Sequence, residues 1–378
     1  MAIPMTDEQH MIQLMVRDFA RKEIEPVAMR NDAEGEFPAE IIKKMGGLSL
    51  LGMMVPEQYG GAGASAVSYV LAIEEVAFAC ASTAVTMAVS NLACGPILNF
   101  GNEEQKMKYL VPLASGKHIG AFAITEPESG SDAASVSTRA VKKGNSYILN
   151  GSKIFITNGG YASTFIVIAR TDKEQRARGL SAFIVEKGTP GFEIGREEDK
   201  MGLRASNTVS LNFEDCKIPA ENLLGEEGIG FTVAMTALDS GRIGIAAQAV
   251  GIARAAFAEA VNYANTRKQF GRSLARNQAI QWMIANALRD IEAAHLLTVS
   301  AALSKDAGVS FTLEASIAKL FATEAANRIV YDALQIHGGY GYTKEFKIER
   351  LYRDARVTTI YEGTSEIQRI VIANNALK

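Results

Sequence analysis

A single carboxylate near the C-terminus has the neighbours that acid–base chemistry requires. Glu362 stands in the stretch 360–368 (IYEGTSEIQ), between an aromatic residue and a glycine. A general base needs a carboxylate beside a backbone that another molecule can approach closely, which Gly363 would permit. The stretch also fits a helix start, with Thr364 or Ser365 as N-cap and acids near the positive end of the helix dipole. The motif alone leaves both interpretations open.

Three further stretches carry more polar and aromatic side chains than a scaffold needs. In the first, a predicted strand ends in the hydroxyl-rich loop 125–132 (TEPESGSD), which suits a plain turn or the binding of a polar ring edge and a phosphate. In the second, 153–160 (KIFITNGG), Phe155 and Thr157 lie two residues apart, hence on one side of a strand, where they could cover a flat cofactor. In the third, 267–272 (RKQFGR), three cations surround an aromatic residue at a helix end, which favours either a solvated helix end or phosphate binding.

The composition is that of an ordinary soluble protein. The chain has 378 residues, of which 48% are apolar and 21% charged, and a net charge of −3. This lacks the basic bias of nucleic-acid-binding proteins, so no nucleic acid is expected as a partner. The three cysteines form no CxxC pair and the four histidines lack ligand spacing. We therefore expect neither a disulfide framework nor a metal site.

The first ten residues, MAIPMTDEQH, show neither an apolar signal core nor an Arg/Ser-rich transit pattern. The apolar stretches 81–98 and 243–257 are interrupted by polar residues, so no membrane span is expected. These features predict a cytoplasmic protein, or a protein of the mitochondrial matrix only where a transit peptide has been removed.

The elements that must position these stretches begin with helices. Apolar residues that recur at helical spacing until Pro26 predict a helix at 7–29, and similar patterns predict a helix at 38–51 and a longer helical zone at 66–100. No charged residue occurs from 76 to 100. Such a segment must be buried against the core or an apolar ligand.

Short alternating runs then predict a small antiparallel β-domain over roughly 119–220, with Asn150-Gly151 as its strongest hairpin signal. After Pro219, helices are predicted at 228–265, 275–306, 310–336 and 366–376, and four such helices make a bundle. We expect an α+β protein with an N-terminal helical domain (1–118), a middle antiparallel β-domain (119–226) and a C-terminal four-helix bundle (227–378). The order helix, sheet, helix disfavours a Rossmann fold.

Taken together, five stretches resemble the acyl-CoA dehydrogenase family, in particular its short-chain and branched-chain, butyryl-CoA dehydrogenase-like members. They are TEPESGSD at 125–132, FITNGG at 155–160, RKQFGR at 267–272, QIHGGYGY at 335–342 and YEGTSEIQ at 361–368. The resemblance spans essentially the whole chain. It implies an enzyme of fatty acid β-oxidation that converts a short, branched or small cyclic acyl-CoA to the 2,3-enoyl-CoA. Glu362 would take the α-proton, and the β-hydrogen would pass as hydride to N5 of FAD.

The resemblance also implies partners and site residues. Electrons would pass to electron-transferring flavoprotein, and the chain would form a homotetramer, a dimer of dimers. Implied substrate-binding residues are Ser131, Asp239, Arg242 and Gly363. Implied FAD-binding residues are Phe122, Ile124, Thr125, Ser131, Phe155, Thr157, Arg267, Phe270, Gln278, Thr364 and Glu366, with Gln335, Gly338 and Gly339 supplied by a neighbouring subunit.

Some family members carry the base at the position matching Gly241, which has no side chain here, so Glu362 is the one candidate. Residues 76–100, where the acyl end should lie, supply no cation for a distal carboxylate, which predicts an apolar acyl group. Two alternatives stay open: an acyl-CoA oxidase or other flavin oxidase of the same architecture, and a noncatalytic CoA-binding helical assembly.

Overall fold

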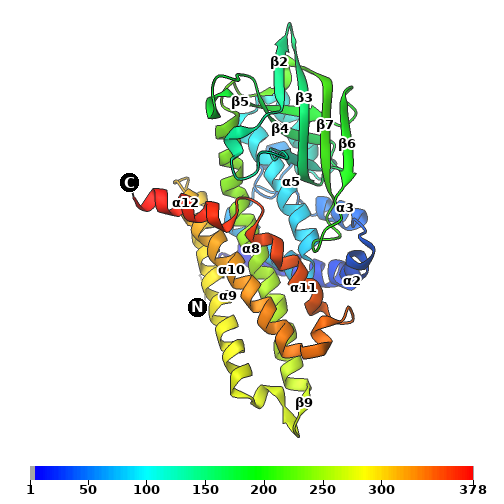
Figure 1. Cartoon of the computed structure of the whole chain (residues 1–378), viewed down its shortest axis with the longest axis vertical. Helices are drawn as coiled ribbons and strands as arrows, with labels where there is room; N and C mark the ends of the chain where they lie inside the picture. The colour runs from blue at the N-terminus through cyan, green and yellow to red at the C-terminus, as the bar shows by residue number, and fades with distance from the viewer. Residues whose placement is uncertain (1–4, 378) are drawn as a thin grey trace.

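The computed structural model describes residues 5–377. Residues 1–4, part of the N-terminal segment tested above for a targeting signal, and Lys378 lie outside the described residues. Helices form both ends of the chain and strands form its middle, which confirms the predicted fold class (Figure 1). The strands lie at one end of the long helices, and the small β9 hairpin lies at the other (Figure 1).

The first predicted helix, 7–29, is confirmed and continues past Pro26 to Glu34. A π-helical turn (Ala20–Ile24) joins α1 to α2, and Pro26 falls in the first turn of α2, where its missing N–H costs no hydrogen bond. The N-terminal helices are α1 (Asp7–Phe19), α2 (Glu25–Glu34), α3 (Ala39–Gly47), α4 (Ala66–Ala79), α5 (Ala81–Phe100), α6 (Glu103–Gln105) and α7 (Val111–Ala114).

The predicted helical zone 66–100 is two helices, because the chain is extended at Cys80 (φ −156°, ψ 114°). Side chains from the C-terminal part bind carbonyl groups on both sides of this break. Arg350 Nη2 donates to the Ala79 carbonyl at 3.0 Å, and Gln248 Nε2 donates to the Ala81 carbonyl at 2.8 Å. The buried polar backbone around the interruption therefore has partners.

The middle of the chain forms one sheet in the strand order β6-β7-β3-β2-β4-β5-β8, with β1 paired to β4. Its pairs are antiparallel except β1 with β4 and a single pairing of β2 with β4, which are parallel. The strands are β1 (Gly120–Ala123), β2 (Arg139–Lys143), β3 (Ser146–Thr157), β4 (Thr164–Arg170), β5 (Leu180–Glu186), β6 (Phe192–Glu197), β7 (Thr208–Pro219) and β8 (Leu223–Leu224).

The predicted hairpin at Asn150-Gly151 is wrong, because both residues lie inside the continuous strand β3. Gly151 (φ 145°) marks a bulge in the pairing with β7, and Asn150 exchanges hydrogen bonds with Asp215. A Cβ at Gly151 would lie 2.6 Å from Thr138 Oγ1, so glycine is needed there for close approach. The actual turn between β2 and β3 is at 144–145.

Three long helices dominate the C-terminal part (Figure 1), and α8 packs closely against α4. A Cβ at Gly244 would lie 2.6 Å from the Tyr69 hydroxyl, and one at Gly251 would lie 2.5 Å from the Glu74 carbonyl oxygen, so the small residues on α8 permit this crossing. Helix α11 was not anticipated from the sequence. The elements are α8 (Gly230–Thr266), β9 (Lys268–Gln269), β10 (Arg272–Ser273), α9 (Gln278–Asp306), α10 (Thr312–His337), α11 (Lys347–Arg356) and α12 (Ser365–Ala376).

Two helices, α5 and α8, are long and apolar enough to cross a membrane by length and mean hydropathy alone. Most of each apolar window is buried inside the protein, against other helices and the sheet. Their apolar character is therefore explained by their place in the core.

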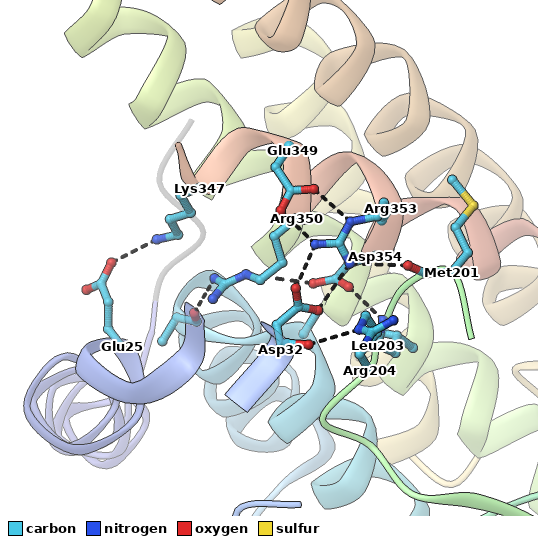
Figure 2. A network of polar contacts seen from close by, with 12 residues as sticks. Glu25, Asp32, Met201, Leu203, Arg204, Lys347, Glu349, Arg350, Arg353 and Asp354 are labelled. Atoms are coloured by element: carbon cyan, nitrogen blue, oxygen red, sulfur yellow. Dashed lines mark hydrogen bonds and ion pairs between the residues drawn. The ribbon is translucent and has the colours of Figure 1, made fainter. Parts of the chain in front are cut away.

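A polar network joins α11 to distant parts of the chain (Figure 2). Arg353 donates to both carboxylate oxygens of Asp32 in α2, at 2.6 and 3.2 Å. Arg204 Nε donates to the Asp32 carbonyl, and the buried Asp354 accepts a 2.6 Å hydrogen bond from the Leu203 N–H. Burial raises the pKa of Asp354 to about 6. The network fixes α11, and with it the chain leading to residues 360–368.

Candidate functional site

The backbone at Glu362 has an unusual conformation that several side chains support. Glu362 has φ 53°, in the left-handed region that non-glycine residues avoid, and Gly363 follows with φ 87°. Lys319 Nζ donates to the Gly363 carbonyl at 2.7 Å. Gln368 Nε2 donates to the carbonyls of Glu362 and Gly363 at 3.2 and 2.9 Å. The turn is therefore held from two sides.

The helix-start interpretation of the same stretch is also correct. Thr364 is the N-cap of α12, and its hydroxyl accepts a hydrogen bond from the Ile367 N–H at 3.3 Å. Glu366 lies exposed in the first helical turn, and its hydrogen bond with Thr364 lowers the pKa of its carboxyl. Glu362 precedes the cap, so its side chain serves no role in starting the helix.

The Glu362 carboxylate lies over Gly241 of α8. A Cβ at Gly241 would be 2.5 Å from Glu362 Oε2, so the missing side chain makes room for the carboxylate. Glu362 Oε2 is buried and has no hydrogen-bond partner within residues 5–377. Burial raises the pKa of Glu362 to about 7, although Arg242 and Lys319 act to lower it. An unpartnered carboxylate that titrates near neutral pH has the properties of a general base.

A cavity of about 180 Å³ adjoins this carboxylate, with Gly241 in its wall. Most of the lining is apolar and comes from α5 and α8, which supports the expectation that the uncharged segment 76–100 faces a ligand or the core. The lining residues from α5 are Ala88, Asn91, Leu92, Cys94, Gly95, Leu98 and Asn99, and those from α8 are Thr236, Ala237, Ser240 and Gly241.

Lys305 also lines the cavity, and sequence reasoning missed it. Its Nζ donates to Ser240 Oγ at 3.0 Å and to Met54 Sδ at 3.3 Å. Burial lowers the pKa of Lys305 to about 8. Residues 76–100 supply no cation, but Lys305 in α9 places a cation in the same cavity from a distant part of the sequence.

Asp239 and Arg242, two predicted substrate-binding residues, form an ion pair at 2.6 Å beside Glu362. Thr312 of α10 donates to Asp239 at 2.6 Å, and Arg242 Nη1 lies 3.4 Å from Ser316 Oγ. Arg242 is buried, and Gly363, another predicted residue of this kind, directly follows Glu362, whereas Ser131 is exposed in its loop. The structure thus brings three of the four predicted substrate-binding residues close to the carboxylate.

The β-sheet brings two of the predicted cofactor stretches together. The Ile154 N–H donates to the Thr125 carbonyl at 3.0 Å, and Lys153 Nζ donates to the Ile124 carbonyl at 3.0 Å. Lys153 also forms a buried 2.8 Å ion pair with Glu126. The start of loop 125–132 is therefore fixed against β3.

Phe155, next to this junction, has φ 58° and a side chain that is 60% exposed. Ile156 is buried and Thr157 is partly exposed, so Phe155 and Thr157 lie on the side of β3 away from the core. Phe122 is buried in β1. An aromatic ring presented on a strained backbone beside polar backbone groups suits a flat ligand with a polar edge.

A remote group of predicted cofactor residues lies in and around the β9 hairpin and the helix ends next to it, at the end of the long helices away from the β-sheet (Figure 1). From Gly241 to Arg267, α8 rises about 1.5 Å per residue, or about 39 Å in all. The Arg267 guanidinium lies over the Tyr340 ring at 5.4 Å, which joins two of the stretches. This remote group cannot contact a ligand beside Glu362 of the same chain. Its members are Arg267, Phe270, Gln278, Gln335, Gly338 and Gly339.

Two residues near the carboxylate were not anticipated. Lys319 is fully buried in α10, and Tyr69 of α4 lines the cavity. The sequence could have indicated a buried Lys319, because this lysine shares an alanine-rich helical face with the buried residues Ala315 and Ala322. A charged side chain at such a position requires a partner.

The cysteines Cys80, Cys94 and Cys216 are free and buried, as expected from their surroundings. In the part of the chain that the structure describes, no three His, Cys, Asp or Glu side chains are placed to hold a metal ion.

Comparisons with known proteins agree with this arrangement. Family models for the acyl-CoA dehydrogenase N-terminal, middle and C-terminal domains match residues 6–117, 121–216 and 228–377. The chain is 55% identical to an acyl-CoA dehydrogenase of Bacillus subtilis (strain 168) over 98% of both chains.

Two solved structures are similar along their whole length, with 100% of both chains covered. Butyryl-CoA dehydrogenase from Megasphaera elsdenii is 46% identical, with a TM-score of 0.98. A chain from a structural study of the electron transferring flavoprotein of Acidaminococcus fermentans is 48% identical, with a TM-score of 0.99.

Proposed function

Because this chain belongs to the acyl-CoA dehydrogenase family, whose members are FAD-containing oxidoreductases acting on CH–CH groups, we propose that it oxidises a short, branched or small cyclic acyl-CoA to the 2,3-enoyl-CoA. One observation carries this proposal: the unpartnered Glu362 carboxylate beside an apolar cavity. The similarity to a butyryl-CoA dehydrogenase supports the substrate class.

Glu362 is the proposed base. The thioester carbonyl acidifies the α-hydrogen, Glu362 accepts it as a proton, and the carbon–carbon double bond forms as the β-hydrogen leaves with its electron pair. The Glu362 N–H, oriented by the left-handed turn, is proposed to hold the thioester oxygen. Glu362 Oε2 is buried from water, which favours proton transfer.

FAD fits the residues on the β-sheet side. Phe155 is exposed and Thr157 is partly exposed on β3, and the start of the polar loop after β1 is hydrogen-bonded to the same strand. FAD, when bound, supplies the acceptor for the hydride. The chain's own part there is to hold the cofactor with Phe122, Ile124, Thr125, Ser131, Phe155, Thr157, Thr364 and Glu366.

The remote group is proposed to serve the FAD of a neighbouring subunit in a homotetramer. Phe270 is fully exposed, and Trp282 and Tyr342 are 60% and 88% exposed, on the same helical part of the chain. Large exposed aromatic side chains are typical of association surfaces.

The domain limits 1–118, 119–226 and 227–378 stay predictions.

The first test is Glu362→Gln, which keeps the shape of the side chain and removes its basicity. We expect turnover of butyryl-CoA to fall by about 10²- to 10⁴-fold, while the flavin absorbance per protein stays unchanged. Glu40→Gln, on the exposed face of α3, is the matched control and should keep full activity. An active Glu362→Gln variant contradicts the assignment.

The second test is a panel of acyl-CoAs ranked by kcat/KM. The cavity is mainly apolar, and Lys305 already has Ser240 as a partner, so butyryl-CoA should be strongly preferred over glutaryl-CoA. Comparable turnover of glutaryl-CoA would contradict the proposed apolar acyl group. If the glutaryl-CoA turnover were then lost in a Lys305→Met variant, Lys305 would be the group that binds the distal carboxylate.

The third test separates a dehydrogenase from an oxidase. The substrate should bleach the flavin without oxygen, and reoxidation should be slow in air and fast with electron-transferring flavoprotein, a partner that one structural relative supports. Fast reoxidation by air would favour the oxidase. A purified protein without flavin would favour a noncatalytic CoA-binding assembly.

A further inference from the structure

Lys319 of α10 contacts the Glu362-Gly363 turn. It is fully buried, and its Nζ donates to the Gly363 carbonyl at 2.7 Å, 44 residues away in the sequence. A buried ammonium group is costly unless a charge or several acceptors compensate it. Among the charged groups, the Glu362 carboxylate has the largest compensating effect on Lys319, and their Coulombic interaction opposes the effect of burial on the pKa of both groups.

The charged and titratable groups around Glu362 come from each element packed on it. Arg242 of α8 and Lys319 of α10 favour the ionised carboxylate, whereas the buried hydroxyls of Tyr69 and Tyr361 carry no charge at neutral pH because burial raises their pKa values. Arg242 also lowers the pKa of Lys319, whereas Glu366 and Glu324 raise it. Arg242 has the larger effect on the pKa of Glu362 but is also paired with Asp239 at 2.6 Å, and Lys319 is the second cation that favours the ionised carboxylate.

Gln368 offers a natural comparison. It is fully buried and, like Lys319, donates to the Gly363 carbonyl, but it is neutral. The two side chains therefore share a hydrogen-bonding role at the turn and differ in charge. Separate substitutions of Lys319 and Gln368 therefore distinguish the effect of the backbone geometry from the effect of the charge.

We propose that Lys319 is a positioning residue for the dehydrogenation: it holds the left-handed Glu362-Gly363 turn through the Gly363 carbonyl and keeps the neighbouring carboxylate in its proton-accepting form. This inference rests on the proposed function, because Glu362 must be the base for its ionisation to limit turnover. Lys319 does not line the cavity beside Glu362.

The test compares pH profiles of kcat/KM for butyryl-CoA in the FAD-loaded wild-type, Lys319→Met and Gln368→Met enzymes. Lys319→Met should lower kcat by about 10- to 100-fold, because the turn shifts, and should move the acidic limb upward by about 1 pH unit, because the carboxylate loses a nearby cation. Gln368→Met should lower kcat without moving the limb. Lys347→Met, which removes a lysine paired with Glu25 far from the turn, should leave the limb in place.

An activity-independent readout uses the same variants. The loss of thermal stability caused by Lys319→Met should be smaller in a Glu362→Gln background, because the two charges are then no longer coupled. If Lys319→Met loads FAD poorly, Lys319→Gln, which keeps a donor and removes the charge, should give the same limb shift.

Two outcomes overturn the inference. An acidic limb that stays in place in Lys319→Met, or one that moves equally in Gln368→Met, means that Lys319 has only a structural role. Either result would leave the proposed function intact as long as the wild-type enzyme is active and Glu362→Gln is not. An inactive, flavin-loaded wild-type enzyme would instead refute the proposed function itself.

Discussion

A methyl group added at Gly241 would test the position of Glu362 without touching the carboxylate. In Gly241→Ala, the new Cβ would lie 2.5 Å from Glu362 Oε2, 3.1 Å from Glu362 Cδ and 3.2 Å from Leu92 Cδ1, whereas ordinary contacts begin at 3.4 Å. The carboxylate must therefore withdraw by the difference between 3.4 and 2.5 Å, about 0.9 Å. A misplacement of about 1 Å costs on the order of 10²-fold in rate, or about 2.7 kcal/mol of activation free energy.

The same substitution should leave the fold in place. Alanine is favoured over glycine in a helix interior by about 0.5–1 kcal/mol, which offsets part of the strain of the added methyl group. The assays are kcat/KM for butyryl-CoA, flavin absorbance per protein and the thermal unfolding temperature. Gly47→Ala, at a position where a Cβ meets nothing within 4 Å, is the control. A Gly241→Ala enzyme within threefold of wild-type kcat/KM would refute the placement of Glu362 over Gly241.

Two further predictions concern buried carboxylates. Because burial raises the pKa of Glu362 to about 7, kcat/KM should decline as the pH falls below about 7 and the base becomes protonated; a rate that stays flat down to pH 5 would contradict this. Burial alone would raise the pKa of Glu126, but Lys153, with hydrogen bonds from Ser137 and Thr138, lowers it to about 2. Glu126→Gln should therefore cost about 3–5 kcal/mol at neutral pH, because it leaves Lys153 buried and unpaired. This loss should shrink as the pH falls from about 4.5 towards 2, where the wild-type carboxylate is protonated; urea unfolding at several pH values measures it, and a difference independent of pH would disprove the pairing.

The parts of the site that the sequence predicts are those whose signal is local. The stretch 360–368 contains both its helix cap and its carboxylate, and the structure shows the two side by side. The family resemblance places a second possible base at position 241, and because Gly241 has no side chain, that base is absent here. Both inferences need only a few consecutive residues.

The parts that the sequence does not predict depend on contacts between distant residues. Lys319 lies 44 residues from its carbonyl partner, and Lys305 lies 65 residues from Ser240. The break at Cys80 is accompanied by a hydrogen bond from Arg350 to Ala79, 271 residues away, with no local glycine or proline to mark it. At Asn150-Gly151 the local turn signal is real, but packing against Thr138 and pairing with β7 turn it into a bulge.

The network around α11 has a consequence for how the chain folds as it leaves the ribosome. Arg350 binds the end of α4, Arg353 binds Asp32, and Lys347 binds Glu25, so the first helices to be synthesised obtain these partners from nearly the last segment. Chains that stop before Lys347 would lack the cationic partners of Glu25, Asp32 and the Ala79 carbonyl. Packing of the N-terminal helices can therefore be complete only after Arg353 has been synthesised.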